Sequence, residues 1–217
     1  RTRRVSPNYD ARPDGAVIDM LVLHYTGMQS AQAAIGRLCD PASRVSSHYV
    51  VEEDGRVHAL VPEAARAWHA GVSNWRGRTE LNAFSVGIEI VNPGHEWGYR
   101  PFPALQMAAV CELCLGILSR HPIAPRNVVG HSDIAPSRKQ DPGELFDWPG
   151  LAANGVGLWP GADDAPVDDV DAALTAIGYG PDPLALAAFQ RHWRPENVTG
   201  EADAETRVRL AAVLSAL

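Results

Sequence analysis

The sequence is poor in cysteine, has no long apolar run and shows no excess of basic residues, and each of these absences excludes a class of protein. Only 3 of its 217 residues are cysteine, an odd number that offers no disulfide framework. No apolar stretch approaches the roughly 18 residues of a membrane-spanning helix, so we expect no transmembrane segment. Asp and Glu outnumber Lys and Arg by 26 to 19, and such a chain lacks the basic surface that binds nucleic-acid phosphates. We therefore expect no nucleic-acid partner.

The cysteines and the start of the chain bear on the cellular compartment. Cys111 and Cys114 are three residues apart in an apolar helical pattern. This pattern favours two core residues over a metal or redox pair, because the sequence offers no second ligand pair. Unpaired cysteines and the absence of a signal peptide favour the cytoplasm. The first residue is Arg rather than Met, however, which indicates that the natural N-terminus has been removed and leaves the compartment open.

The order of apolar patterns indicates the fold class. Hydrophobic residues make up 46% of the chain and charged residues 21%, a balance typical of globular proteins. Apolar strand patterns alternate with helical ones, which predicts an α/β domain with a mixed central sheet flanked by helices. Two β-rich runs flank the pair Asp54 and Gly55, which predicts a β-hairpin. Further strands are expected at residues 18–23, 84–91 and 127–131, and helices at residues 30–40 and 103–119, the second with an apolar stripe from Leu105.

The composition changes at residues 161–166, which predicts a linker between two domains, residues 1–160 and 167–217. Beyond the linker lie three short helical patterns separated by gaps that contain Gly or Pro, at residues 167–177, 183–193 and 204–217. A segment of this size and pattern predicts a small C-terminal three-helix bundle that packs on the larger domain.

The positions of two of the eight histidines are informative. His24 and His131 each stand where a predicted strand delivers its last side chain to the edge of the sheet, and Asp141 follows in a polar loop. Two imidazoles and one carboxylate leave room for an exchangeable fourth position, which is the pattern of a catalytic zinc site. The spacing alone also fits two hydrogen-bonded core histidines and a loop carboxylate. A structural zinc site would need a fourth ligand, which the sequence does not make evident.

Two charged residues point to chemistry at the same place. Glu89 interrupts an apolar strand, where a carboxylate costs several kcal/mol unless it is paired or functional. Strand alternation puts Glu89 on the face opposite Ile88 and Ile90, so a solvent-facing residue is the alternative. Lys139 precedes Asp141 by two residues and can point into the same loop cavity, or it is a surface lysine. A metal, a carboxylate base and a fixed cation together form a hydrolase site.

Other polar residues stay open between functional and structural roles. His69 either lines the substrate groove or is a structural histidine. Asp133 is either an orienting partner of a metal-bound histidine or a cap in its loop. His48 heads a strand and is expected to be structural. The remaining histidines are expected to be surface or packing residues: His58, His95, His121 and His192.

Several stretches of the sequence together resemble a known family. They are residues 22–25, 47–50, 67–71, 82–89 and 130–143, of which the last is the longest and most specific. These stretches resemble the zinc-dependent N-acetylmuramoyl-L-alanine amidases of the amidase-2 family, which are related to phage lysozyme-type amidases and peptidoglycan-recognition proteins. Residues 187–190 and 200–206 resemble the C-terminal peptidoglycan-binding-like helical domain of outer-membrane amidases of this family.

The resemblance implies a residue-level mechanism. It implies one zinc ion bound by His24, His131 and Asp141, an acid/base role for Glu89 and a transition-state role for Lys139. The bond cleaved is then the amide between N-acetylmuramic acid and L-alanine, in peptidoglycan or its fragments. Glu89 takes a proton from water and returns it to the departing amine, and Lys139 stabilises the oxyanion.

Two alternatives to a wall amidase remain at this point. A non-catalytic peptidoglycan-binding protein on the same fold typically lacks a metal ligand, so the intact ligand set argues against it. A cytosolic amidase that recycles anhydro-muropeptides keeps the chemistry but changes the substrate. The C-terminal helices favour the bacterial cell envelope (periplasm), with the cytoplasm as the alternative. A monomer is favoured.

Overall fold

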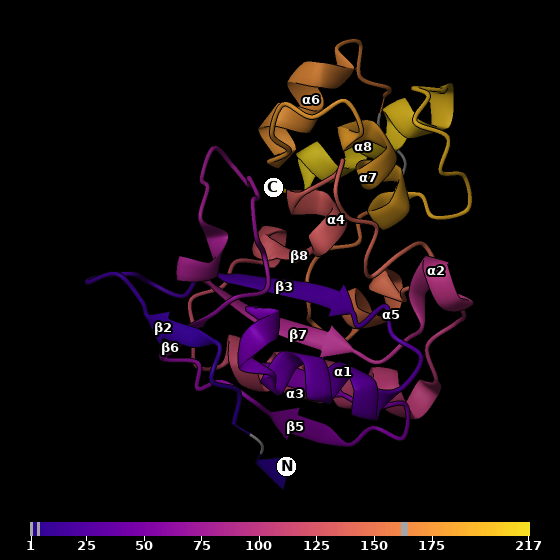
Figure 1. Cartoon of the computed structure of the whole chain (residues 1–217). Coiled ribbons are helices and arrows are strands. Elements are labelled where there is room, and N and C mark those ends of the chain that lie inside the picture. The colour runs from indigo at the N-terminus through magenta and orange to yellow at the C-terminus, as the bar shows by residue number, and fades with distance from the viewer. Residues whose placement is uncertain (1, 4, 162–164) are drawn as a thin grey trace.

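The computed structural model describes residues 2–3, 5–161 and 165–217 (Figure 1). Half of the predicted linker at residues 161–166, namely residues 162–164, therefore lies outside the described residues. In Figure 1 the central sheet lies in the lower part of the molecule, and the helices formed by the C-terminal residues lie above it. Within the described part of the chain, no helix has both the length and the hydropathy to cross a membrane.

The central sheet is mixed, as the sequence predicts. Its six strands lie in the order β1 (Thr2–Arg3), β5 (Val57–Ala59), β4 (Tyr49–Val51), β7 (Ser85–Ile90), β3 (Met20–Tyr25) and β8 (Val128–Gly130). Strands β4, β7, β3 and β8 run parallel to one another, whereas β4 and β5 form the predicted antiparallel hairpin. A separate two-stranded sheet pairs β2 (Tyr9–Ala11) with β6 (Ala65–Ala67), and no sequence pattern predicted it.

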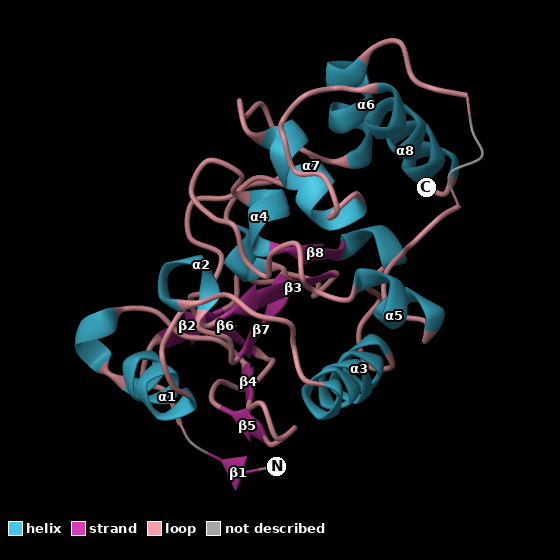
Figure 2. Ribbon diagram, turned by 90° about the vertical axis from the view of Figure 1, so that its right-hand side faces the viewer, coloured by secondary structure: helices cyan, strands magenta, loops and turns pink. Residues whose placement is uncertain are grey.

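Helices cover both faces of the sheet (Figure 2). Helix α1 (Ala31–Cys39) lies on one side and α3 (Ala104–Leu118) on the other, at the predicted positions. Short helices connect the remaining elements: α2 (Gly94–Trp97), α4 (His131–Ile134) and α5 (Trp148–Ala153), with 3-10 turns at Pro41–Ser43, Leu81–Ala83 and Pro125–Asn127.

Alternation along the strands assigns each side chain to one of the two faces. Leu21 and Leu23 of β3 pack with Ile88 of β7 in the core beneath α3. Met20 and Val22 point to the opposite face. Since successive side chains of a strand alternate, His24 and Glu89 share the face opposite α3.

The predicted stripe of α3 is wrong at its start. Leu105 is 70% exposed, and the fully buried residue of that turn is Gln106. The Gln106 side-chain amide donates to the backbone carbonyls of Val51 and Val91 at 3.1 and 2.8 Å. A buried amide is stable there because these carbonyls accept its hydrogens. The interpretation of Cys114 as a core residue is correct, since it is fully buried.

The C-terminal residues form the three expected helices, α6 (Val170–Ile177), α7 (Ala185–Trp193) and α8 (Ala204–Ser215). Their apolar side chains do not form a core of their own. They belong to one buried cluster with Met20, Val22 and Val129 of the sheet. The C-terminal helices thus complete the hydrophobic core on the sheet face that carries His24.

Candidate active site

The carboxyl ends of three parallel strands bring the candidate residues together. His24 and Glu89 lie near the ends of β3 and β7, and the register of these two strands places them side by side. His131 follows directly after β8, as the first residue of α4. Asp141 lies in the loop beyond α4, where its backbone carbonyl accepts from the Ser132 amide at 2.9 Å.

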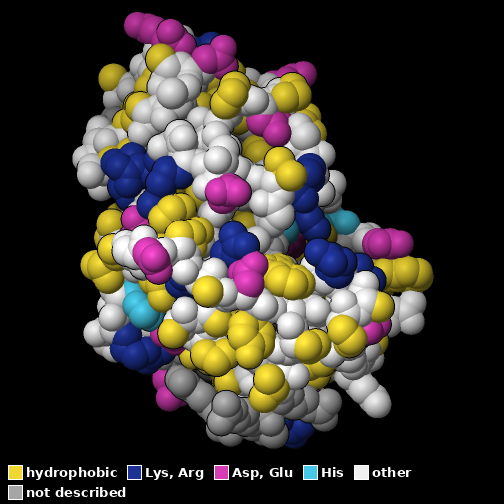
Figure 3. Space-filling view, turned by 60° about the vertical axis from the view of Figure 1, so that its left-hand side comes forward, with side chains coloured by type: hydrophobic (Ala, Val, Ile, Leu, Met, Phe, Trp, Pro, Cys, Tyr) yellow, Lys and Arg dark blue, Asp and Glu magenta, His cyan; other side chains and the backbone are white. Residues whose placement is uncertain are grey.

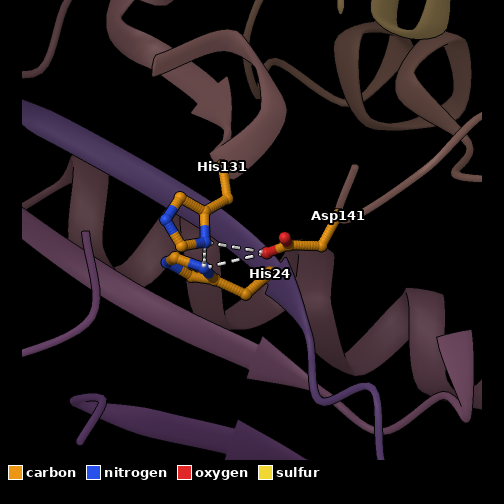
Figure 4. Close-up of side chains that lie close together, drawn as sticks. All are labelled: His24, His131 and Asp141. Carbon is orange, nitrogen blue, oxygen red and sulfur yellow. Dashed lines mark hydrogen bonds and ion pairs between the residues drawn. The ribbon is translucent and has the colours of Figure 1, made fainter. Parts of the chain in front are cut away.

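The two histidines and Asp141 form a compact triangle (Figure 4). The Nδ1 atoms of His24 and His131 are 2.9 Å apart, and each lies 3.1 Å from Asp141 Oδ2. The three side chains are buried, with exposed fractions of 1% for His24, 3% for His131 and 5% for Asp141. Among the residues that the structure describes, these three form a group whose possible ligand atoms all lie within 4.8 Å of one another. That is close enough to hold a metal ion.

The chemistry of these donors fits zinc. A zinc ion with bonds of about 2.0–2.1 Å to tetrahedral ligands keeps those ligands about 3.3 Å apart, close to the separations observed. Burial, followed by the electrostatic interaction with His131, lowers the pKa of His24 to about 4, so its ring is neutral at pH 7. Burial raises the pKa of Asp141, but His131 and His24 outweigh it and hold that pKa well below its usual range. A neutral imidazole and a carboxylate are the forms that bind metal.

Glu89 lines the cavity beside the triangle. Burial, reinforced by the charge of Asp141 and opposed by that of Lys139, raises the pKa of Glu89 well above its usual range. Its Oε2 atom is buried and has no hydrogen-bond partner among the described residues. Glu89 as a whole residue is half-buried, so it is neither a core nor a freely exposed side chain, and its unpaired carboxyl oxygen lies inside the protein beside the cavity.

Lys139 lines the same cavity. Its positive charge lowers the pKa of both His24 and Glu89, which places the ammonium within electrostatic reach of each. The backbone amide of Lys139 donates to the carbonyl of Ala135 at 3.0 Å, so the turn after α4 fixes its position.

The cavity has a volume of about 700 Å³, enough for a ligand of several linked groups. His131 and Asp141 of the triangle, together with Glu89 and Lys139, form part of its lining. Helix α1 contributes Arg37, and the indoles of Trp68 and Trp97 face the same space. Trp97 is 51% exposed, so an aromatic surface is available to a ligand.

His69 is buried against the triangle, with an exposed fraction of 8%. Its Nδ1 lies 3.1 Å from His24 Nε2, and its Nε2 lies 3.2 Å from Ser85 Oγ. Burial, followed by the electrostatic interactions with His24 and His48, lowers the pKa of His69 well below its usual value. That His69 also contacts substrate stays a prediction.

Asp133 does not orient His131, so that hypothesis is wrong. Its carboxylate accepts from the Gly130 amide at 2.7 Å and from Tyr179 at 2.6 Å, and it pairs with His192 Nδ1 at 2.7 Å. The predicted cap is therefore present, and the two other partners come from the C-terminal segment. His192 packs between Trp148 and Trp193, with ring centroids 3.8 and 4.2 Å away. The sequence alone gave no signal of these contacts.

The other histidines lie outside the triangle. His48 is structural, since its Nδ1 accepts from the Gly87 amide at 2.9 Å. His58 pairs with Glu52, His121 with Glu63, and His95 with Glu144.

A mixed sheet whose strand ends bring two histidines, an aspartate and a half-buried glutamate together beside one cavity has the side-chain set of a hydrolase site. The family model described as N-acetylmuramoyl-L-alanine amidase matches residues 14–144, and the chain belongs to this Amidase_2 family. It is an N-acetylmuramoyl-L-alanine amidase, an enzyme that hydrolyses the amide between N-acetylmuramic acid and L-alanine.

Two curated relatives differ in how much of the chain they share. N-acetylmuramoyl-L-alanine amidase AmiD of Escherichia coli is 40% identical over 230 residues, which cover 91% of this chain and 82% of AmiD. The 1,6-anhydro-N-acetylmuramyl-L-alanine amidase AmpD of Haemophilus influenzae is 37% identical over 161 residues, or 66% of this chain and 85% of AmpD.

Two solved structures match almost the whole fold. The complex of E. coli AmiD with anhydro-N-acetylmuramic acid-L-Ala-D-γ-Glu-L-Lys has a TM-score of 0.82 at 39% identity and covers 94% of this chain and 92% of that one. AmpDh3 from Pseudomonas aeruginosa, in complex with anhydromuramic pentapeptide, has a TM-score of 0.82 at 33% identity, with 96% of each chain covered.

Proposed function

We propose that this amidase uses one zinc ion held by His24, His131 and Asp141. The observation that supports this most directly is the buried triangle of two Nδ1 atoms and one carboxylate oxygen within 3.1 Å of one another. A bound zinc ion supplies Lewis-acid activation of a water molecule and of the substrate carbonyl.

In this proposal Glu89 is the acid/base. Its unpaired Oε2 accepts the proton of the attacking water and later returns it to the departing L-alanine nitrogen. Lys139 is the fixed cation that stabilises the negative charge on the former carbonyl oxygen. Both side chains line the cavity that contains the triangle.

The replacement of Glu89 by the isosteric Gln tests this assignment. Glu89→Gln removes the proton acceptor and leaves the three metal-binding side chains in place. We expect zinc content equal to that of the wild type and a decrease in kcat of about 10²–10⁴-fold. Elemental analysis and steady-state kinetics on an anhydro-muropeptide measure the two quantities. A Glu89→Gln enzyme with full zinc and full turnover would disprove the role.

We further propose that the enzyme acts on anhydro-muropeptides and also on peptidoglycan itself, in the bacterial cell envelope. The AmiD and AmpDh3 complexes contain anhydromuramyl peptides, which supports the first substrate. The likeness of residues 187–190 and 200–206 to peptidoglycan-binding domains supports the second, with residues 1–160 as the catalytic domain and residues 167–217 as the binding domain. Function as a monomer is part of the same proposal.

Mass spectrometry of the released products distinguishes these substrates. Incubation with intact sacculi is expected to release free stem peptides, and incubation with purified anhydro-muropeptide is expected to release the same peptide. Release from the soluble substrate alone would contradict the wall-directed part of the proposal and favour the recycling role in the cytoplasm.

A further inference from the structure

His24 and His131 both turn Nδ1 toward the metal position. The Nε2 atoms, on the other side of each ring, contact two residues that are adjacent in the sequence. The Nε2 atom of His24 lies 3.1 Å from His69 Nδ1, and the Nε2 atom of His131 lies 3.1 Å from the carbonyl oxygen of Ala70. The pair His69–Ala70 thus contacts both imidazoles on the side away from the metal position.

The donors and acceptors between Ser85, His69 and His24 can be assigned in turn, starting from the Ser85 hydroxyl. The Ser85 hydroxyl donates to the Leu81 carbonyl at 2.7 Å, which uses its only proton. Its contact with His69 Nε2 at 3.2 Å therefore requires His69 Nε2–H as the donor. In a neutral ring the Nδ1 atom of His69 is then an acceptor, so His24 donates from Nε2–H and keeps a bare Nδ1.

The His131 side reaches the same result through the backbone. A carbonyl oxygen only accepts, so the contact with Ala70 requires His131 to donate from Nε2–H and again leaves Nδ1 bare. Arg138 donates to the same oxygen from Nη2 at 3.0 Å. The orientation and tautomer of both rings are therefore set by one dipeptide.

This dipeptide is itself held in place from two directions. Asn82 Oδ1 accepts from both of its backbone amides, His69 N–H at 3.1 Å and Ala70 N–H at 2.8 Å. The His69 ring lies directly over Gly87 of β7, where an added Cβ would stand 2.5 Å from the ring Cγ. The strand thus has room for the ring because residue 87 has no side chain.

We propose that His69 and the Ala70 carbonyl are the positioning groups that hold His24 and His131 as Nδ1 metal ligands. Hydrogen-bonded partners of this kind fix the ring orientation and typically contribute about 10–100-fold to metal affinity. The proposal rests on the proposed zinc site and adds His69 to it as a residue that acts through His24.

Two substitutions of His69 that have the same shape as each other, one with and one without a hydrogen-bond acceptor, test the hydrogen bond to His24 separately from the loss of the ring. Asn places its Oδ1 near the position of the imidazole Nδ1 and can accept from His24, whereas Leu has the same shape without an acceptor. We expect His69→Leu to weaken zinc binding about 10–100-fold and His69→Asn to stay close to the wild type. Competition with a chromophoric zinc chelator measures both affinities. Equal affinities in the two variants would overturn the proposal.

A second measurement needs no substitution. Long-range ¹H–¹⁵N correlation spectra report which nitrogen of each histidine carries the proton. In metal-free wild-type protein, Nε2 of His24, His131 and His69 is expected to carry a proton, and a bare Nε2 at His24 would overturn the proposal. If the wild type bound no zinc, the proposed function would fail, while this tautomer measurement would still decide the role of His69.

Discussion

Among single residues, three side chains that line the cavity, Glu89, Asp141 and Lys139, act on one another electrostatically. The carboxylates of Glu89 and Asp141 repel one another, and Lys139 is the cation that lowers the pKa of Glu89 against burial and that repulsion. A group that stabilises an oxyanion must carry a hydrogen-bond donor or a positive charge and must be in place before the negative charge develops. Lys139 meets both conditions, since it lines the cavity and the turn after α4 fixes its backbone.

Replacement of Lys139 by Met removes this charge and keeps most of the side-chain length. We expect kcat to decrease by about 10²–10³-fold, because a donor to the developing oxyanion is lost. Zinc content is expected to stay unchanged, since Lys139 is outside the ligand triangle. Lys139→Arg is the matched control and should retain part of the activity. Steady-state kinetics with zinc analysis measure the effect, and wild-type kcat in Lys139→Met would exclude the role.

The sequence was informative about those residues whose position follows from local pattern. His24 could be predicted at the end of a strand, and Glu89 on the face opposite Ile88 and Ile90, because strand ends and strand alternation are local properties. The partners of these residues could not. Ser85 and the Ala70 carbonyl contact the histidines only through the tertiary fold, and Asp133 accepts from His192, 59 residues further along the chain. No local pattern encodes such contacts.

Among the helices and strands, the boundaries that could be predicted from the sequence are those set by turn and cap residues. Ser30 accepts from the Ala33 amide at 3.1 Å and begins α1 where the sequence indicated, because its side chain satisfies a free helical N–H. Asp54 and Gly55 lie in the turn between β4 and β5. The burial of Gln106 was missed because its partners are carbonyls of two strands that are distant in sequence.

One carboxylate connects the hairpin to the end of α3. Glu63, just beyond β5, accepts from Tyr49 at 2.6 Å and from Arg120 at 2.7 Å, and it pairs with His121 at 2.6 Å. Burial raises the pKa of Glu63, but the hydrogen bonds from Arg120, Tyr49 and His121 outweigh it and lower the pKa to about 2. The ionised form of Glu63 therefore stabilises the folded state.

This cluster predicts a pH-dependent difference between two proteins. Because the folded-state pKa of Glu63 is below its ordinary value, its contribution is complete above about pH 5 and is lost as the pH falls toward 2. We expect Glu63→Gln to lower the free energy of unfolding by about 2 kcal/mol at pH 7 and by much less at pH 3. Urea unfolding of both proteins at each pH measures this. A difference independent of pH would contradict the assignment.

In the whole molecule, the net charge says little about the binding surface, whereas the buried core shows how the C-terminal helices are attached to the sheet. The net charge is −7, yet Lys and Arg side chains lie across the middle of the face shown in Figure 3, with Asp and Glu side chains among them and at the upper end. The overall charge therefore says little about where an acidic stem peptide would bind. The buried apolar residues, by contrast, connect the C-terminal helices to the sheet in one cluster.

This shared core predicts that the C-terminal helices and the sheet unfold together. Phe189 of α7 is fully buried in the cluster, near Tyr179 and Trp193. Phe189→Ala is expected to cost about 3–5 kcal/mol, because it leaves a cavity where the ring stood. If the core is continuous, this loss shifts the unfolding of the whole chain, so circular dichroism and tryptophan fluorescence should give one coincident transition at a lower urea concentration.

A matched control makes this test specific. Leu184 precedes α7 and is 49% exposed, so Leu184→Ala should leave the transition almost unchanged. The contrary result for Phe189→Ala would be two separate transitions, with the first confined to the C-terminal helices. In that case residues 167–217 would be an independently folding domain.

A single transition instead means that any peptidoglycan-binding role of these helices belongs to a segment that also supports the catalytic sheet. Helix α4, which begins with His131, packs directly on α7, so a loss of α7 packing should then also weaken zinc binding.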